Sequence, residues 1–187
     1  MPKTVVGISG SLRNGSLNTL LLRAAQELAP ADLKVEIVSI RDVPLYDGDV
    51  ELEHGIPAPV QALKDRVAGA SGLLLATPEY NNSIPGVLKN AIDWMSRPPA
   101  DIARVFRDRP VALMGATPGQ GGTILAHAAW LPVLRTLGTR PWFEGRVLIS
   151  GAGKVFDADG RIGDDATRRR VQSFVEGFAA FASSQSR

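Results

Sequence analysis

Four polar side chains lie close together near the start of the chain, in a segment whose residue types suit the binding of an anion. One or two other residues separate neighbouring members of the set, which comprises Ser11, Arg13, Ser16 and Asn18. Their hydroxyl and amide groups offer neutral hydrogen-bond donors, and the guanidinium adds a positive charge. We therefore expect this segment to bind an anion through its side chains.

The residues around this segment predict a strand before it and a helix after it. Residues 5–8 are rich in β-branched side chains, which is typical of a strand buried on both faces. The apolar residues that follow recur at helical spacing and are Leu17, Leu20, Leu21, Ala24, Ala25 and Leu28. A helix start favours an anion because its backbone N–H groups lack partners and its dipole is positive there. A plainer alternative is that Ser16 or Asn18 only caps the helix while Arg13 faces solvent.

The segment differs from two common phosphate-binding motifs. A Walker loop requires a lysine followed by serine or threonine, and the segment contains no lysine. The dinucleotide fingerprint Gly-x-Gly-x-x-Gly lets the backbone approach a pyrophosphate, whereas polar side chains occupy the corresponding positions here. Side chains that surround an anion favour a terminal monophosphate.

Strands and helices are predicted to alternate along the rest of the chain. Further strands are expected at residues 35–38, 72–76, 111–114, 140–143 and 147–149, and helices at 60–68, 85–95, 123–137 and 165–181. Proline and glycine residues predict a long loop at 42–59, and Asp159-Gly160 predicts a hairpin turn between 154–156 and 161–162. Pro132 predicts a kink in, or a late start to, its helix. This alternation predicts one α/β domain over residues 1–187, a doubly wound parallel sheet in three layers.

Two more unusual loops follow predicted strands, and the carboxyl ends of parallel strands are where such domains bind ligands. The second loop begins at Thr77, where Pro78 and Pro85 stiffen its ends, so the residues between them suit the edge of a planar heteroaromatic ring, with Tyr80 as a wall. The third loop, residues 115–122, is rich in glycine, so a flat ligand can approach its backbone. The plainer alternatives are a turn in which Ser83 caps the next helix and a flexible connection.

Three segments together resemble the NAD(P)H-dependent FMN reductase family, which includes bacterial chromate and quinone reductases and related azoreductases. They are Gly-Ser-Leu-Arg-x-x-Ser-x-Asn at 10–18, Pro-Leu-Tyr-Asp at 44–47, and Thr-Pro-Glu-Tyr-Asn-x-Ser-x-Pro-Gly-x-Leu-Lys-Asn-Ala-Ile-Asp-Trp at 77–94. The resemblance implies a flavodoxin-like fold with sheet order 2-1-3-4-5 and one bound FMN per subunit. It also implies homodimers or homotetramers in which the FMN lies near a subunit interface.

The resemblance further implies which residues bind the FMN. The phosphate would be held by Ser11, Arg13, Ser16 and Asn18, with Leu17 beside them. The isoalloxazine ring would be lined by Pro78, Glu79, Tyr80, Asn81, Asn82 and Ser83, and supported by Gly115, Ala116, Thr117 and Gly119. The chain departs from the family pattern after Gly122, which leaves its acceptor preference and its interface pairing open.

The expected reaction is a ping-pong transfer of electrons from NADPH or NADH to a small-molecule acceptor such as a quinone, a flavin, an azo compound or chromate. The flavin carries the redox chemistry, so no catalytic side chain is expected, and His54 and His127 are assigned surface or packing roles. A flavodoxin-like electron carrier is the main alternative, although carriers favour an acidic surface and this chain has a net charge of +2. A dehydrogenase that uses Asp42 on a ribose is disfavoured because the glycine fingerprint is absent.

Composition excludes several other classes of protein. The chain has no cysteine, which excludes disulfides and thiolate metal sites, and no spacing of acidic residues or histidines indicates a metal. Basic residues are dispersed except at Arg168–Arg170, where acidic neighbours favour a solvated helix face over nucleic-acid binding. No apolar run is long enough to span a membrane and no secretion signal is evident, so we expect a cytoplasmic protein.

Overall fold

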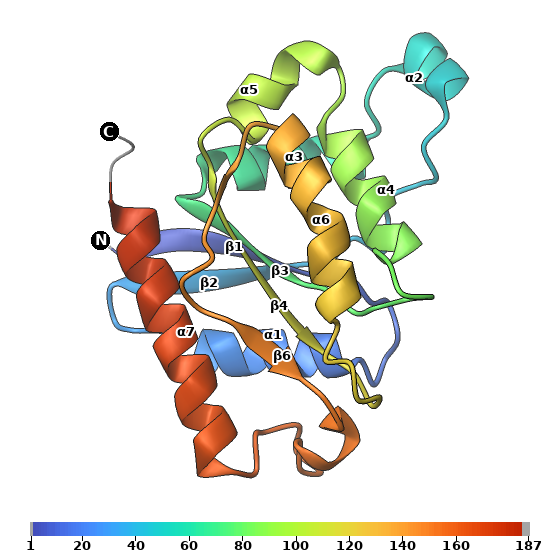
Figure 1. Cartoon of the computed structure of the whole chain (residues 1–187). Coiled ribbons are helices and arrows are strands. Elements are labelled where there is room, and N and C mark those ends of the chain that lie inside the picture. Colours follow the sequence, from blue (N-terminus) through green and yellow to red (C-terminus); the bar gives the residue numbers. More distant parts are fainter. Residues whose placement is uncertain (1, 185–187) are drawn as a thin grey trace.

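A parallel sheet forms the centre of the molecule (Figure 1), in a computed structural model that describes residues 2–184. Its strands are β1 (Lys3–Ser9), β2 (Leu33–Val38), β3 (Gly72–Ala76), β4 (Pro110–Ala116), β5 (Arg140–Pro141) and β6 (Val147–Ile149). The order is β2-β1-β3-β4-β5, with β6 also paired to β4, and every pairing between these strands is parallel. The predicted doubly wound, flavodoxin-like fold is therefore confirmed.

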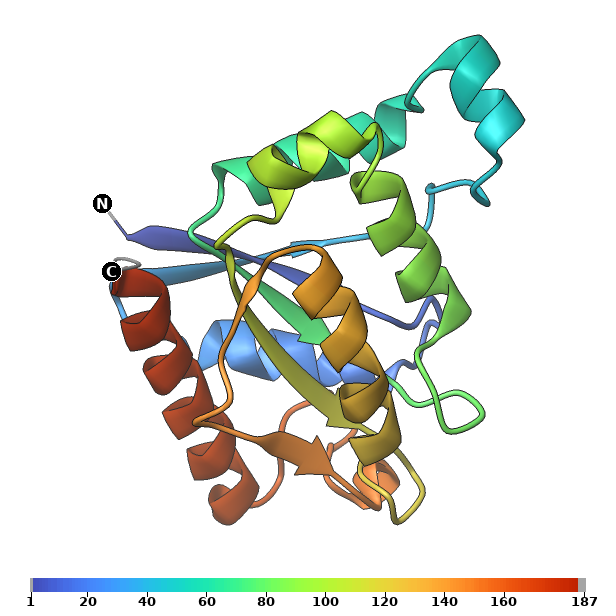
Figure 2. The same cartoon turned by 45° about the horizontal axis from the view of Figure 1, so that its top comes forward.

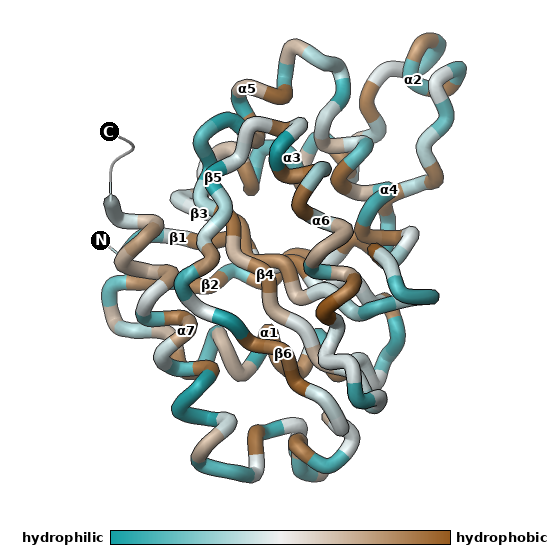
Figure 3. The backbone as a smooth tube through the Cα atoms, in the orientation of Figure 1, coloured by the Kyte–Doolittle hydropathy of each residue, from teal (hydrophilic) through white to brown (hydrophobic). Residues whose placement is uncertain are grey.

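Helices cover both faces of this sheet and bury two separate apolar layers. On one face lie α1 (Leu17–Glu27) and α7 (Asp165–Ser183), packed against side chains such as Val5 and Leu74. On the other face lie α3 (Ala58–Gly69), α4 (Gly86–Met95), α5 (Ile102–Val105) and α6 (Ile124–Thr136). Successive strand residues alternate between the two layers, because side chains in a strand point to opposite faces. Figure 3 shows hydrophobic, brown backbone along much of β4 and β6.

The structure corrects the sequence prediction for three short helical elements outside the sheet. The predicted loop at 42–59 was wrong in part, since α2 (Gly48–His54) lies within it and is capped by Asp47, whose side chain accepts from the Asp49 N–H at 2.9 Å. None of the α2 residues is buried, so no apolar periodicity marks it. A short 3₁₀ turn, η1 (Pro99–Asp101), and α5 were also not predicted. Figures 1 and 2 both show α2 projecting away from the sheet.

Three smaller expectations also change. The strand predicted at 140–143 is shortened to β5, and the predicted hairpin at 154–162 reduces to one antiparallel bridge between Phe156 and Ile162, preceded by the 3₁₀ turn η2 (Ala152–Lys154). The turn itself is present, because Gly160 adopts a φ of 78°. Pro132 lies inside α6, which begins at Ile124 and therefore has no late start.

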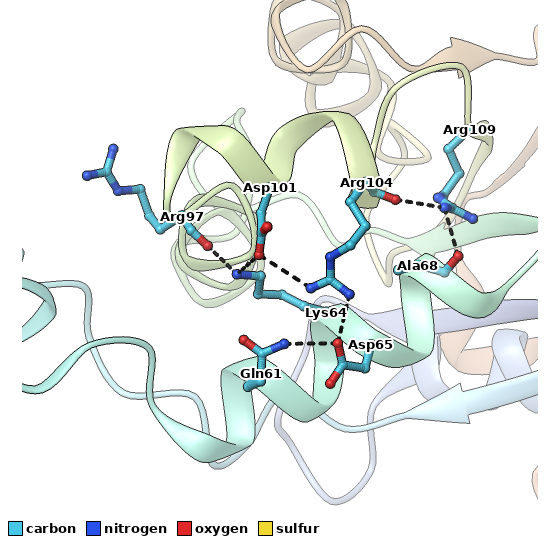
Figure 4. A network of polar contacts seen from close by, with 8 residues as sticks. All are labelled: Gln61, Lys64, Asp65, Ala68, Arg97, Asp101, Arg104 and Arg109. Carbon is cyan, nitrogen blue, oxygen red and sulfur yellow. Dashed lines mark hydrogen bonds and ion pairs between the residues drawn. The ribbon is translucent and has the colours of Figure 1, made fainter.

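A polar network joins α3 to the segment that follows α4 (Figure 4). The side chain of Lys64 is fully buried, lies 2.7 Å from the Asp101 carboxylate, and donates to the Arg97 carbonyl. Arg104 extends the network to Asp65 at 2.8 Å. The hydrogen bond from Lys64 holds the pKa of Asp101 below its usual value. Removing one partner of a pair with a buried charge is costly, so this network fixes the segment that follows α4.

The same segment anchors the projecting α2. Arg97 forms an ion pair with Glu51 in α2 at 2.7 Å, and the Trp94 indole donates to the Pro44 carbonyl at 2.9 Å. The Tyr46 ring packs edge-on against Trp94, with 4.8 Å between the ring centroids. The resemblance motif at 44–47 is thus fastened to α4 by the tryptophan that ends the longer motif at 77–94.

Candidate functional site

The three loops singled out in the sequence meet at one cleft at the carboxyl edge of the sheet. The cleft has a volume of about 290 Å³. It is lined by Ser11, Arg13, Gly15, Ser16, Leu17, Asn18, Pro78, Glu79, Tyr80, Ala116, Thr117 and Pro118. Because β1, β3 and β4 are adjacent and parallel, their carboxyl ends bring together loops that are far apart in the sequence.

One end of the cleft is the start of α1. Ser11 and Ser16 are buried there, whereas Arg13 is exposed. Ser16 caps the helix, since its Oγ accepts from the Thr19 N–H at 3.1 Å, so the capping alternative is correct for this residue. Within residues 2–184, the N–H groups of Leu17 and Asn18 donate to no protein acceptor. Two backbone donors, two hydroxyl groups and a guanidinium therefore remain at a position that favours an anion.

Asn18 has a second role that the sequence did not reveal. Its Nδ2 donates to the Ala116 carbonyl at 2.9 Å, and its Oδ1 accepts from the Ala116 N–H at 3.0 Å. The residue is buried, with only 3% of its surface exposed. The side chain thus fastens the first loop to the end of β4, from which the third loop starts.

The first and second loops approach each other closely at Gly10. A Cβ atom at this position would lie 2.8 Å from Pro78 Cδ and 2.9 Å from Leu88 Cδ2, so only glycine fits without displacement. The Tyr80 hydroxyl also lies 3.4 Å from Ser11 Oγ, which is longer than an ordinary hydrogen bond between hydroxyl groups. Glycine is needed here for contact between the loops.

The tip of the second loop is a two-residue hairpin. Tyr80 and Ser83 exchange both backbone hydrogen bonds, at 3.2 and 3.1 Å, and Asn81 and Asn82 have positive φ angles of 50° and 60°. Asparagine tolerates this left-handed conformation better than most residues. Asn81, Asn82 and Ser83 are exposed and do not line the cleft, and Ser83 is not the cap of α4, where Pro85 stands.

Glu79 connects the second loop to α6. Its Oε2 accepts from the Leu125 N–H at 2.8 Å and from the Ala126 N–H at 3.1 Å. These groups lie in the first turn of α6, where a negative charge is stabilised by the helix dipole. The residue before this helix, Thr123, has a φ of 66° and its side chain caps nothing, so Glu79 supplies the missing cap.

The third loop contributes Ala116, Thr117 and the unpredicted Pro118 to the cleft, but not Gly115 or Gly119. A Cβ atom on Gly115 would lie 2.0 Å from Thr123 Oγ1 and 2.6 Å from the Thr77 carbonyl, so packing against these neighbours requires glycine. The Gly119 N–H donates to Thr117 Oγ1 at 3.2 Å. Gly15 also lines the cleft and was not predicted, because a glycine offers no side chain that signals binding.

The two histidines lie outside this cleft. His54 ends α2 and is exposed, whereas His127 is partly buried on α6. Among residues 2–184, no three His, Asp or Glu side chains are grouped as a metal site would require, and no helix of this part of the chain has the length and hydropathy of a membrane span. The cleft itself is lined by one basic side chain, that of Arg13, and one acidic side chain, that of Glu79.

Comparisons with known proteins agree on one family. A family model described as NADPH-dependent FMN reductase matches residues 3–154. The chain is 44% identical over 172 residues to an NAD(P)H-dependent FMN reductase of Pseudomonas aeruginosa, covering 92% of this chain and 91% of the relative. It is 36% identical over 181 residues to a 2-hydroxy-1,4-benzoquinone reductase of Burkholderia sp, covering 97% of each.

A solved structure extends the agreement to three dimensions. The flavoenzyme NAD(P)H:(acceptor) oxidoreductase FerB of Paracoccus denitrificans superposes with a TM-score of 0.86 at 36% identity. The match covers 96% of this chain and 97% of that one. A quinone reductase of Escherichia coli is 37% identical over 182 residues, covering 95% of this chain and 94% of the relative.

Proposed function

The chain belongs to the NADPH-dependent FMN reductase family and is an NAD(P)H-dependent reductase, and we propose that it holds one FMN in the three-loop cleft and reduces quinones. The observation that carries this proposal is that polar donors at the start of α1 and the stiff or planar side chains of Pro78, Tyr80 and Pro118 line one cleft. The names of the relatives, two of which are quinone reductases, support the choice of acceptor.

The anion end of the cleft fits the phosphate of FMN. A phosphate monoester carries up to two negative charges and three terminal oxygens, which match the donors gathered at the start of α1. Arg13 would supply the only full positive charge among the residues that line the cleft. Ser11 and Ser16 would donate hydroxyl hydrogen bonds, and the free N–H groups of Leu17 and Asn18 would complete the shell.

The other end of the cleft fits a flat ring. Pro78, Tyr80 and Pro118 present stiff or planar surfaces from two loops, and the contacts of Asn18 and Glu79 hold those loops in place. When bound, FMN supplies the hydride acceptance and electron transfer of the reaction. The chain's own residues would bind and orient it. The one carboxylate that lines the cleft, that of Glu79, already accepts hydrogen bonds from two N–H groups of α6.

We propose that NADPH or NADH and the acceptor use the same exposed face of the cleft in turn, which corresponds to ping-pong kinetics. Tyr80 is 42% exposed and would border this face.

We also propose that the protein is a homodimer or homotetramer whose interface passes near the cleft. Two exposed apolar side chains, Leu45 just before α2 and Leu52 on α2, support an oligomer because an isolated subunit would leave them in water.

Purification tests the proposed function directly. We expect a yellow protein whose flavin absorbance bleaches when NADPH or NADH is added and returns when benzoquinone is added. Initial rates at several quinone concentrations should give parallel double-reciprocal lines, as a ping-pong mechanism requires. A protein that binds added FMN but turns over neither nicotinamide would be the electron carrier instead, and one that cannot bind FMN would contradict both proposals.

A further inference from the structure

Asn14 is the only asparagine of the chain that a glycine follows, and it lies in the first loop directly after Arg13. Both Asn14 and Gly15 are exposed. They form the centre of a turn, which the Ser16 N–H closes by donating to the Arg13 carbonyl at 3.2 Å. Asparagine and glycine are common in such turns. Because Gly15 lines the three-loop cleft, the turn places an amide side chain in water beside the proposed phosphate site.

The two central residues of this turn are free to react with each other. Within residues 2–184, the Asn14 side chain forms no hydrogen bond and the Gly15 N–H donates to no acceptor. A Cβ atom at Gly15 would meet nothing within 4 Å, so no neighbouring group crowds this part of the backbone. The side-chain amide carbon of Asn14 and the backbone nitrogen of Gly15 are therefore both accessible.

The other four asparagines of the chain lack this freedom. Asn18 is 3% exposed, and its Oδ1 and Nδ2 both form hydrogen bonds with Ala116. Asn90 uses both of its amide atoms in hydrogen bonds to the backbone of the segment before α2. Asn81 and Asn82 are exposed, but each is followed by a residue whose side chain hinders approach to the backbone nitrogen. The asparagine of the first loop alone combines exposure, a free amide and a following glycine.

This arrangement permits loss of the amide group without an enzyme. The Gly15 nitrogen gives its proton to water or hydroxide and attacks the side-chain carbonyl carbon of Asn14, so that a C–N bond forms there. The bond from that carbon to the amide nitrogen breaks, and this nitrogen takes up a proton and leaves as ammonia. Water then opens the cyclic imide at either carbonyl carbon, which gives aspartate or isoaspartate. No electrons are transferred, and a neutral amide becomes a carboxylate that is ionised near pH 7.

We propose that Asn14 is a site of spontaneous deamidation and that its conversion weakens the binding of FMN. The deamidation stands on the turn alone, whereas its effect on FMN rests on the proposed function. The new carboxylate follows Arg13 in the chain, so it competes with a phosphate for the guanidinium and repels the phosphate directly. Because Gly15 lines the three-loop cleft, bound FMN should cover the turn and slow the reaction.

Mass spectrometry of the full chain, aged in mildly alkaline buffer with and without saturating FMN, tests the deamidation. In a proteolytic peptide that contains both Asn14 and Asn18, we expect the amide of Asn14 to convert to the acid while that of Asn18 persists. Saturating FMN should slow the conversion severalfold. Gly15→Ala should also slow it severalfold, because a Cβ atom hinders the nitrogen, and the open space there lets the variant fold. Conversion of Asn14 no faster than that of Asn18 would overturn the proposal.

Asn14→Asp, which carries the charge of the converted residue, tests the effect on FMN. We expect it to weaken the binding of FMN by about tenfold and to leave the binding of riboflavin, which has no phosphate, unchanged in fluorescence titrations. Asn14→Ala is the matched control, because it removes the same amide without adding a charge. Equal affinity of Asn14→Asp and the unmodified protein for FMN would refute the effect. A chain that binds no FMN would contradict the proposed function, while the peptide masses would still decide the deamidation.

Discussion

Asn18→Ala tests whether the hydrogen bonds between Asn18 and Ala116 hold the first loop against the third. The substitution removes both hydrogen bonds to Ala116, of 2.9 and 3.0 Å, at a position that is 3% exposed. The Ala116 N–H and C=O then lose their side-chain partner, and an unsatisfied buried group costs about 1–3 kcal/mol. Since water can enter the space left behind, we expect the free energy of unfolding in urea to fall by about 2–4 kcal/mol.

Binding of riboflavin separates this joining role from a role as a phosphate ligand. Riboflavin lacks the phosphate, so a side chain that only contacts phosphate cannot affect it. Ala116 and Thr117 line the cleft where we propose that the ring binds. We therefore expect Asn18→Ala to weaken the binding of riboflavin and of FMN by a similar factor, about tenfold or 1.4 kcal/mol. Quenching of flavin fluorescence measures both affinities.

Asn14→Ala is the matched control, because Asn14 lies in the same loop, is exposed and makes no side-chain hydrogen bond within residues 2–184. It should leave stability and both affinities unchanged. The reasoning is refuted if Asn18→Ala lowers the affinity for FMN alone, or if it leaves the urea midpoint where it was.

Three other substitutions have distinct expected outcomes. Arg13→Ala should weaken the binding of FMN by about 1.5–3 kcal/mol and leave the binding of riboflavin unchanged, as measured by flavin fluorescence. Arg23→Ala, which changes another exposed arginine, is the control. Burial lowers the pKa of His127 from 6.5 to about 4 on folding, so the stability that the neutral imidazole contributes is complete above pH 6.5 and is lost as the pH falls toward 4. In urea titrations, the unmodified protein should therefore lose about 3 kcal/mol of its free energy of unfolding across that interval, and His127→Phe should abolish this loss. Gly10→Ala should lower stability by about 1–3 kcal/mol in thermal unfolding, because its Cβ would overlap Pro78, and an unchanged midpoint would show that the loops move apart easily.

The sheet and the meeting of the three loops could be predicted because they depend on local patterns. Apolar runs such as residues 72–76 mark buried strands, and the rule that ligands bind at the carboxyl ends of parallel strands then places the loops together. Gly10, Pro78 and Pro85 were each visible in the sequence, although their close approach in space, which requires glycine at position 10, was not.

The features that could not be predicted depend mainly on contacts between residues that are distant in the chain. Glu79 caps a helix that begins 45 residues later, and Asn18 binds a backbone unit 98 residues away, so neither partner can be read from spacing. The helix α2 was not predicted for a different reason. It buries none of its side chains, and its stability comes from the Asp47 cap and from the ion pair between Glu51 and Arg97.

The bond between Asn18 and Ala116 also sets an order of events during synthesis of the protein. The residues of the anion site leave the ribosome early, but Asn18 finds its partner only after 98 further residues have been added. At about 5–20 residues per second, that interval lasts about 5–20 s. A nascent chain that ends before β4 has the whole of the proposed phosphate-binding loop yet lacks the strand that holds it, so we expect flavin binding to begin only once β4 has joined the sheet.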